Sequence, residues 1–173
     1  MPSEVGILSR SDRPILMAGT RVCVPFRPAA QWCADLARIH YLVVDLADDE
    51  GRDALVDLVM DGSAGMEDLR SASFRLLEEA TGRKWWEAGR LMSSSLDPEI
   101  LGRLVLAGVD PWHRSIGEWC AAVYALAVKG QDEKGRMRFE FSLSIPPVGY
   151  EDQWDDGMVD PAAVQASVAG LSR

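Results

Sequence analysis

The sequence is poor in the residue types from which catalytic and metal sites are most often built. It contains two histidines and three cysteines among 173 residues. Neither His40 nor His113 has a serine–histidine–aspartate order or a metal-ligand spacing around it. Cys23, Cys33 and Cys120 form no CxxC pair, and their odd number indicates reduced thiols rather than a disulfide framework or a zinc site. We therefore expect no metal, no cofactor and no enzymatic activity.

Positive charge and long apolar runs are also scarce. The chain has 18 Lys and Arg against 27 Asp and Glu, a net charge of -9, which disfavours the phosphate contacts that supply most nucleic-acid affinity. No apolar stretch approaches the roughly 20 residues that a membrane span needs. Residues 1–16 lack the charged start and sustained apolar run of a secretion signal. We expect no nucleic-acid partner, no membrane contact and a cytoplasmic location.

Apolar residues, in contrast, are plentiful. They make up 47% of the chain, enough for one compact domain with a sizeable core. Their spacing predicts a mainly α fold: a multi-helix domain over residues 15–148 that begins with a small β-hairpin. Residues 1–14 are polar without a clear period and are expected to be a flexible N-terminus.

The C-terminal residues 149–173 are expected to form an acidic, partly disordered tail. The tail carries five negative charges without an intervening Lys or Arg, at Glu151, Asp152, Asp155, Asp156 and Asp160. Such a segment has little apolar surface to bury and does not order itself. A short terminal helix is predicted from Pro161 to about Ala169.

The amino-terminal half is predicted to contain a hairpin and several short helices. Two apolar runs in residues 15–26 flank Ala18-Gly19-Thr20, which favours a small β-hairpin or two edge strands. The apolar spacing in residues 28–39 predicts one helix that begins at Pro28. Residues 40–62 predict either two short helices or one helix broken near Gly51.

The carboxy-terminal half is predicted to be helical throughout. Helices are expected over residues 63–82, 84–93, 96–107 and 115–129, because apolar residues recur there at steps of three and four. Residues 131–145 are ambiguous: their alternating apolar residues suit a strand, whereas the charged residues 132–134 resemble a helix start. We predict a helix, since no partner strand is near in the sequence.

Tryptophan is concentrated between Thr81 and Lys129. Four of the six tryptophans lie there, at positions 85, 86, 112 and 119. Adjacent residues of a helix point about 100° apart, so Trp85 and Trp86 do not share one central position in a core face. Two interpretations remain open. Both rings belong to the core between neighbouring helices, or one of them reaches the domain edge and contacts a partner.

The same region carries a family resemblance. The strings TGRKWWEAGRL and LVLAGVDPWHRSIGEWCAAVYAL, followed by the charged DEKGRMRF and by PPVGYED before an acidic tail, resemble the tail assembly chaperones of long-tailed phages that infect actinobacteria. The resemblance covers roughly residues 68–156 and is looser in the amino-terminal half.

The resemblance implies a helical protein of the host cytoplasm that binds the phage tape measure protein. It would keep that long chain soluble while tail tube subunits polymerise around it, and it would be absent from the mature virion. It also implies a programmed ribosomal frameshift, whose longer product recruits tail tube protein. The present chain would be the shorter product, and self-association of the chaperone is a further expectation.

We hypothesise that an aromatic groove holds a helix of the tape measure protein. The residues expected to line or support this groove are Trp85, Trp86, Leu91 and Trp119. The alternative is a structural virion protein of the head-to-tail connector or tail terminator type. A small DNA-binding regulator is opposed by the net charge and by the lack of a basic helix.

Overall fold

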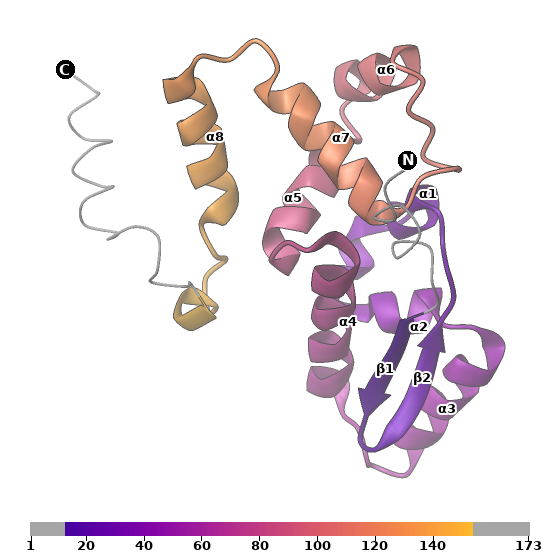
Figure 1. Cartoon of the computed structure of the whole chain (residues 1–173). Helices are drawn as coiled ribbons and strands as arrows, with labels where there is room; N and C mark the ends of the chain where they lie inside the picture. Colours follow the sequence, from indigo (N-terminus) through magenta and orange to yellow (C-terminus); the bar gives the residue numbers. More distant parts are fainter. Residues whose placement is uncertain (1–12, 154–173) are drawn as a thin grey trace, which may run out of the picture.

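The computed structural model of the protein describes residues 13–153 (Figure 1). In this part of the chain eight α-helices follow a two-stranded antiparallel hairpin, which confirms the predicted mainly α fold. Residues 1–12 and 154–173 lie outside the described residues. The expected flexible N-terminus, most of the acidic tail and the helix expected near residues 161–169 therefore fall largely or wholly outside them.

The hairpin pairs β1 (Arg13–Met17) with β2 (Thr20–Val24), with Ile15 opposite Val22. It thus begins two residues earlier than predicted. Its two-residue turn has positive φ at both positions, 47° at Ala18 and 81° at Gly19, which matches the right-handed twist of the strands. Alternate side chains of both strands are buried, because β1 packs on α4 and β2 packs on α3.

The single helix predicted for residues 28–39 is wrong. The chain instead forms the short α1 (Ala29–Trp32) and then the 3-10 segment η3 (Leu36–Tyr41), with Pro28 at the cap rather than inside the helix. The break has a local cause, since the Asp35 carboxylate accepts a hydrogen bond from the Ala37 N–H and caps the second segment. Aspartate favours this capping position over a helix interior.

Two short helices follow, as one of the two alternatives predicted, but the break lies before Gly51. They are α2 (Leu42–Leu46) and α3 (Asp49–Met60), and the Asp48 carboxylate caps α3 through the Gly51 N–H at 2.7 Å. Gly51 sits in the first turn of α3, where an added Cβ would lie 3.0 Å from the Cys23 carbonyl. Glycine is needed here because β2 passes so close to the helix.

The helices predicted for the second half are confirmed, including the ambiguous one. The Asp132 carboxylate caps this last helix by accepting a hydrogen bond from the Gly135 N–H at 2.7 Å. The charged residues 132–134 therefore indicate the helix correctly, whereas the alternating apolar residues that follow them suggest a strand. The elements are α4 (Met66–Thr81), α5 (Trp85–Ser94), α6 (Pro98–Leu106), α7 (Ile116–Val128), α8 (Glu133–Ser144) and the 3-10 turn η4 (Glu151–Gln153).

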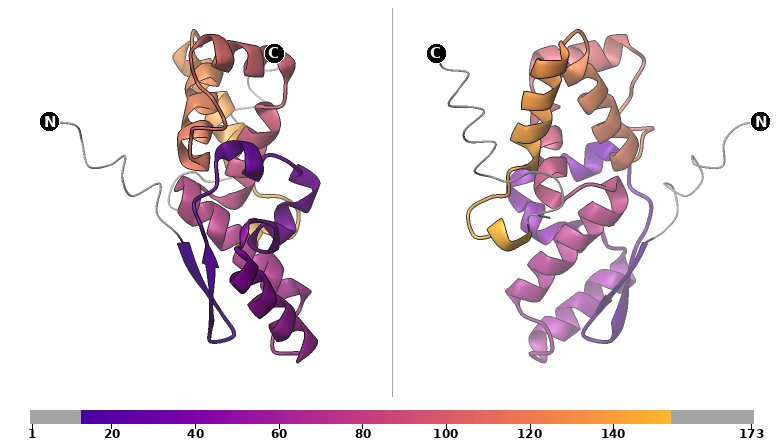
Figure 2. Two further views of the ribbon diagram at one scale, coloured as in Figure 1. Left: turned by 90° about the vertical axis from the view of Figure 1, so that its right-hand side faces the viewer. Right: turned by 60° about the vertical axis from the view of Figure 1, so that its left-hand side comes forward.

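The described part is longer in one direction, with α6 at one end and α3 and the hairpin turn at the other (Figures 1 and 2). Helix α4 lies near the middle and contacts η3, α2, α5, α7 and β1. Its Leu76 and Leu77 are fully buried, as are Leu91 and Met92 of α5 and Val123 of α7. Helix α8 stands at the side of the molecule and contacts α5 and α7.

Candidate functional site

The four residues predicted to bind a partner are all buried. The exposed fraction is 8% for Trp85, 3% for Trp86, 0% for Leu91 and 2% for Trp119. Neither ring of the adjacent tryptophan pair is exposed at the domain edge, so the structure agrees with the interpretation in which both belong to the core. The pair nevertheless lies next to an open surface feature, described below.

Trp85 is the centre of an aromatic cluster that joins four parts of the chain. Its ring stacks on Phe74 of α4, with centroids 3.8 Å apart, and meets the edges of His40, Trp86 and Tyr150. The Tyr150 ring, whose centroid lies 5.2 Å from that of Trp85, comes from the segment that follows α8. This cluster therefore fixes both η3 and the end of the described chain against α4 and α5.

The carboxy-terminal end of α8 lacks the usual backbone donors. The last carbonyls of a helix are commonly bonded by N–H groups of the residues just beyond it. After the cap residue Ile145 the chain continues with Pro146 and Pro147, which have no N–H to donate. The Phe141 carbonyl accepts from the Ser144 hydroxyl of the same helix, and the carbonyls of residues 142–144 need donors from another element.

Two side chains of α5 supply these donors. The Trp86 indole N–H donates to the Ser144 carbonyl at 3.2 Å. The Arg90 Nη1 donates to the carbonyls of Ser142 and Leu143, at 2.8 and 2.7 Å. Trp86 and Arg90 thus determine where α8 ends relative to α5, and they hold the two helices beside each other.

A groove with a volume of about 550 Å³ lies between η3, α5 and the second half of α8. Small-molecule sites commonly have volumes in this range. Its apolar lining comes from Leu36 and Ile39 of η3, Trp85 and Trp86 of α5, and Phe139 and Leu143 of α8.

The groove brings together two of the four predicted residues. Trp85 and Trp86 line it, whereas Leu91 and Trp119 are not among its lining residues and lie in the core. The sequence prediction missed Ile39 and Phe139, which are half-buried. They come from segments about a hundred positions apart, so no local spacing relates them. The only indication in the sequence is that Phe139 is a large apolar residue within a charged helix.

The electrostatic character of the groove differs from that of the whole chain. None of the residues that line the groove is acidic, and the lining includes the cationic Arg90. Lys84, just before α5, places its Nζ 5.9 Å from the centroid of the Trp86 ring. A chain of net charge -9 thus presents an apolar groove accompanied by two cations.

A second contact holds α8 in place through α7. The Tyr124 hydroxyl donates to the Glu140 carboxylate, which also pairs with Arg136 at 3.1 Å. The Tyr124 hydrogen bond and then Arg136 lower the pKa of Glu140, and the same hydrogen bond raises the pKa of Tyr124. The Arg83 guanidinium lies 4.8 Å from the centroid of the Tyr124 ring.

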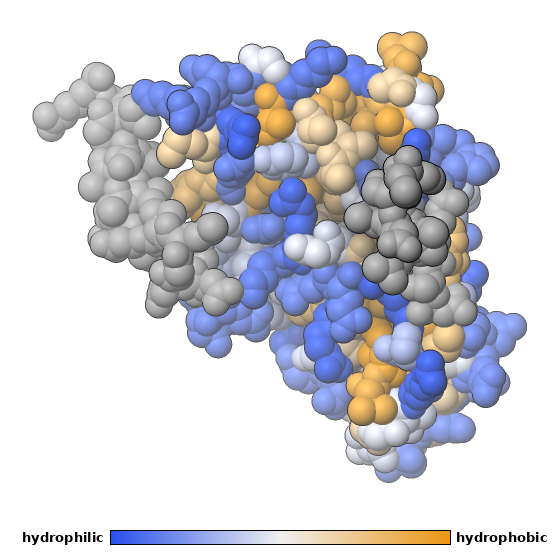
Figure 3. All heavy atoms as spheres, viewed as in Figure 1, coloured by the Kyte–Doolittle hydropathy of each residue, from blue (hydrophilic) through white to orange (hydrophobic). Residues whose placement is uncertain are grey.

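Helix α6 presents an exposed apolar face at one end of the molecule. Leu101, Val105 and Leu106 are exposed, the last of them to 90%, and only Leu104 of this helix is buried. Figure 3 shows hydrophobic side chains over α6 at the upper right. Exposed apolar faces of this kind often mark protein contacts.

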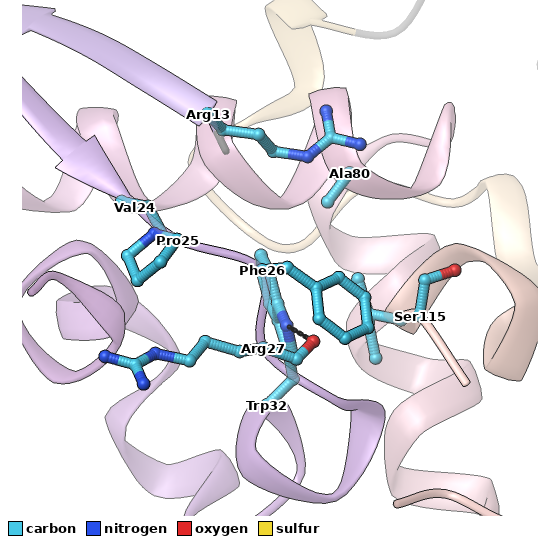
Figure 4. A pocket seen from close by; sticks show the side chains of 9 residues that line it. Arg13, Val24, Pro25, Phe26, Arg27, Trp32, Ala80 and Ser115 are labelled. Carbon is cyan, nitrogen blue, oxygen red and sulfur yellow. Dashed lines mark hydrogen bonds between the residues drawn. The ribbon is translucent and has the colours of Figure 1, made fainter. Parts of the chain in front are cut away.

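A second hollow, between the hairpin and α7, is too small for a ligand. Its volume is about 20 Å³, roughly the space of one water molecule. Figure 4 shows the side chains of Phe26 and Trp32 at its wall, with the Trp32 indole N–H bonded to the Arg27 carbonyl at 3.1 Å. We assign it no function.

Within residues 13–153 no group of three or more His, Cys, Asp or Glu side chains is placed to hold a metal ion. In the same residues no helix is long and apolar enough to cross a membrane. Burial raises the pKa of the Cys33 thiol to about 11 and that of Cys120 to about 12, which suppresses their thiolate forms at neutral pH.

Comparisons of the chain with protein-family models, with curated proteins and with solved structures found no match.

Proposed function

We propose that this protein is a phage tail assembly chaperone that binds the tape measure protein and keeps it soluble while the tail tube forms. The observation that carries the proposal is the open apolar groove between η3, α5 and α8, with Trp85 and Trp86 in its lining. The sequence resemblance in residues 68–156 supports it independently, because its most distinctive string contains this tryptophan pair.

The groove suits a helix of an apolar partner. Amphipathic helices bind in grooves through side chains that recur at steps of three and four. The half-buried Leu36, Ile39 and Phe139 offer apolar walls to such side chains. A tape measure protein exposes long apolar helical stripes before the tube covers them, so it has the chemistry that this groove would bind.

The remaining parts of the proposal are what the sequence resemblance implies. The protein acts in the host cytoplasm and is absent from the mature virion. A longer product of a programmed ribosomal frameshift recruits tail tube protein, and this chain is the shorter product. The exposed apolar face of α6 would serve a contact with another protein, including self-association.

Filling the groove tests the proposal. Ser142 is exposed and lines the groove from α8, so Ser142→Trp places a large ring inside it. Met137 is exposed on the same helix and does not line the groove, so Met137→Trp is the matched control. Each variant is co-expressed with the tape measure protein of the same phage, and the soluble fraction of the tape measure protein is measured.

We expect Ser142→Trp to reduce soluble tape measure protein at least several-fold and Met137→Trp to leave it unchanged. Equal solubility with wild type and Ser142→Trp would contradict a role of the groove. If the wild-type chain gives no more soluble tape measure protein than an empty vector, the chaperone function itself is wrong.

The alternative, a structural virion protein of the connector or terminator type, makes the opposite prediction for the particle. Mass spectrometry of purified virions is expected to find no peptides of this chain. Peptides in stoichiometric amount would favour the structural protein.

A further inference from the structure

The described chain ends beside the groove. Pro147 lines the groove, and three residues later the Tyr150 ring meets the edge of Trp85 at a centroid distance of 5.2 Å. The 3-10 turn η4 then ends at Gln153, the last residue that the structure describes. Residues 154–173 therefore follow from a point that Tyr150 fixes close to the groove.

The sequence of residues 154–173 contains the pattern of an amphipathic helix. Val164, Val168 and Leu171 recur at steps of four and three, which places them on one face of a helix. Asp160 and Pro161 precede this pattern. The same dipeptide begins α6, where the Asp97 carboxylate accepts from the Glu99 N–H at 2.8 Å.

The intervening chain is long enough to bring this pattern to the groove. Residues 154–160 can span up to about 25 Å when extended, since each residue adds at most about 3.6 Å. This segment starts close to the groove, because Tyr150, the residue just before η4, contacts Trp85, which lines the groove.

The charges of the two parts are complementary. The linker contains Asp155, Asp156 and Asp160 and no basic residue. The groove has Arg90 in its lining and Lys84 beside Trp86, and none of its lining residues is acidic. Opposite charges arranged in this way favour one orientation of a segment as it approaches.

We propose that residues 161–171 bind the groove of their own chain as a short amphipathic helix, with Val164, Val168 and Leu171 facing Ile39, Trp86 and Phe139. The segment is a built-in occupant that covers the apolar groove in the free protein. A partner helix that binds the same groove has to displace it. This inference concerns the free protein and does not depend on the identity of the partner.

Hydrogen exchange on the full-length protein, without any partner, tests the proposal. The test variant is Val168→Asp, which puts a charge on the apolar face. The matched control is Ala166→Asp, which adds the same charge on the opposite face of the predicted helix and is the more helix-weakening change of the two. Both substitutions lie outside residues 13–153, so neither replaces a side chain of the described helical domain.

In the wild-type protein we expect the amides of residues 162–171 to exchange at least about tenfold more slowly than an unstructured peptide of this sequence. Val168→Asp should abolish this protection and speed exchange in peptides covering residues 139–144, whereas Ala166→Asp should retain both. Unprotected wild-type amides, or equal effects of the two substitutions, would overturn the proposal.

Dilution separates the intended contact from one between two copies. Protection that stays constant over a hundredfold dilution supports binding within one chain. Protection that disappears on dilution would mean that a second copy supplies the segment, which overturns the proposal. Because no tape measure protein is present, neither result depends on the chaperone function.

Discussion

At the scale of single residues, Gly82 determines where the tryptophan pair lies relative to α4. It ends α4 with φ at 67°, and its N–H donates to the Glu78 carbonyl at 2.7 Å. A left-handed glycine at this position is a frequent way to stop a helix. The turn leaves only Arg83 and Lys84 before α5 begins, so it sets the position of Trp85.

A pair of glycine substitutions tests this role. Gly82→Ala should lower the free energy of unfolding by about 1 to 2 kcal/mol, because a Cβ is unfavourable at positive φ. Gly102→Ala, in the helical interior of α6 with open space around its Cα, should raise it by up to about 1 kcal/mol. Urea denaturation of both variants measures the two changes. Equal effects of the two substitutions would contradict the requirement for glycine at position 82.

At the scale of elements, α8 depends on a few polar contacts. Leu143 is its only buried residue, so apolar burial contributes little to its position. The hydrogen bonds from Trp86 and Arg90 hold its end, and the Tyr124–Glu140 pair holds its middle. Because α8 forms one wall of the groove, the geometry of the groove depends on these contacts.

The Tyr124–Glu140 contact predicts a pH dependence for α8. The pKa of Glu140 in the folded protein is below its ordinary value of 4.5. The contact therefore contributes fully to the stability of the fold above pH 4.5, and this contribution is lost as the pH falls through the lowered pKa. Tyr124→Phe removes the largest cause of the shift and should raise the pKa of Glu140. Carbon NMR titration of the Glu140 carboxyl in both proteins measures it, and an unchanged pKa would contradict the contact.

At the scale of the whole molecule, the core joins the hairpin to the helices. Val22 and Val24 of β2 and Leu55 of α3 belong to the same buried cluster as Leu91 and Val123. Cys33 and Cys120 lie in or against this cluster at half-buried and buried positions. Their reactivity should therefore report on the opening of the molecule.

Thiol labelling checks this expectation. In a Cys23→Ser variant the thiols of Cys33 and Cys120, with pKa values of about 11 and about 12, have at most about one thiolate in a thousand at pH 8. We expect slow reaction with a disulfide reagent in buffer and rapid reaction of both thiols in denaturant. Rapid labelling of either thiol in buffer would show that the core around it opens readily.

Most helix ends of this protein can be predicted from nearby residues alone. The Asp97-Pro98 start of α6, the Ser115 cap of α7 and the Asp132 cap of α8 are predictable because each acts through its nearest neighbours. The break between α1 and η3 was missed, although its cause, the Asp35 cap, is also local. The apolar spacing of residues 28–39 predicts one continuous helix because spacing alone takes no account of a capping carboxylate.

The groove, in contrast, arises from the packing of segments that are distant in the sequence. Ile39, Trp86 and Phe139 are brought together by the packing of η3, α5 and α8, and no spacing in the sequence relates them. Tertiary packing also decided that Trp85 and Trp86 are both buried, since Phe74 stacks on the first and the end of α8 accepts a hydrogen bond from the second. Contacts between distant segments depend on how helices pack, and a helical period specifies only which face is apolar.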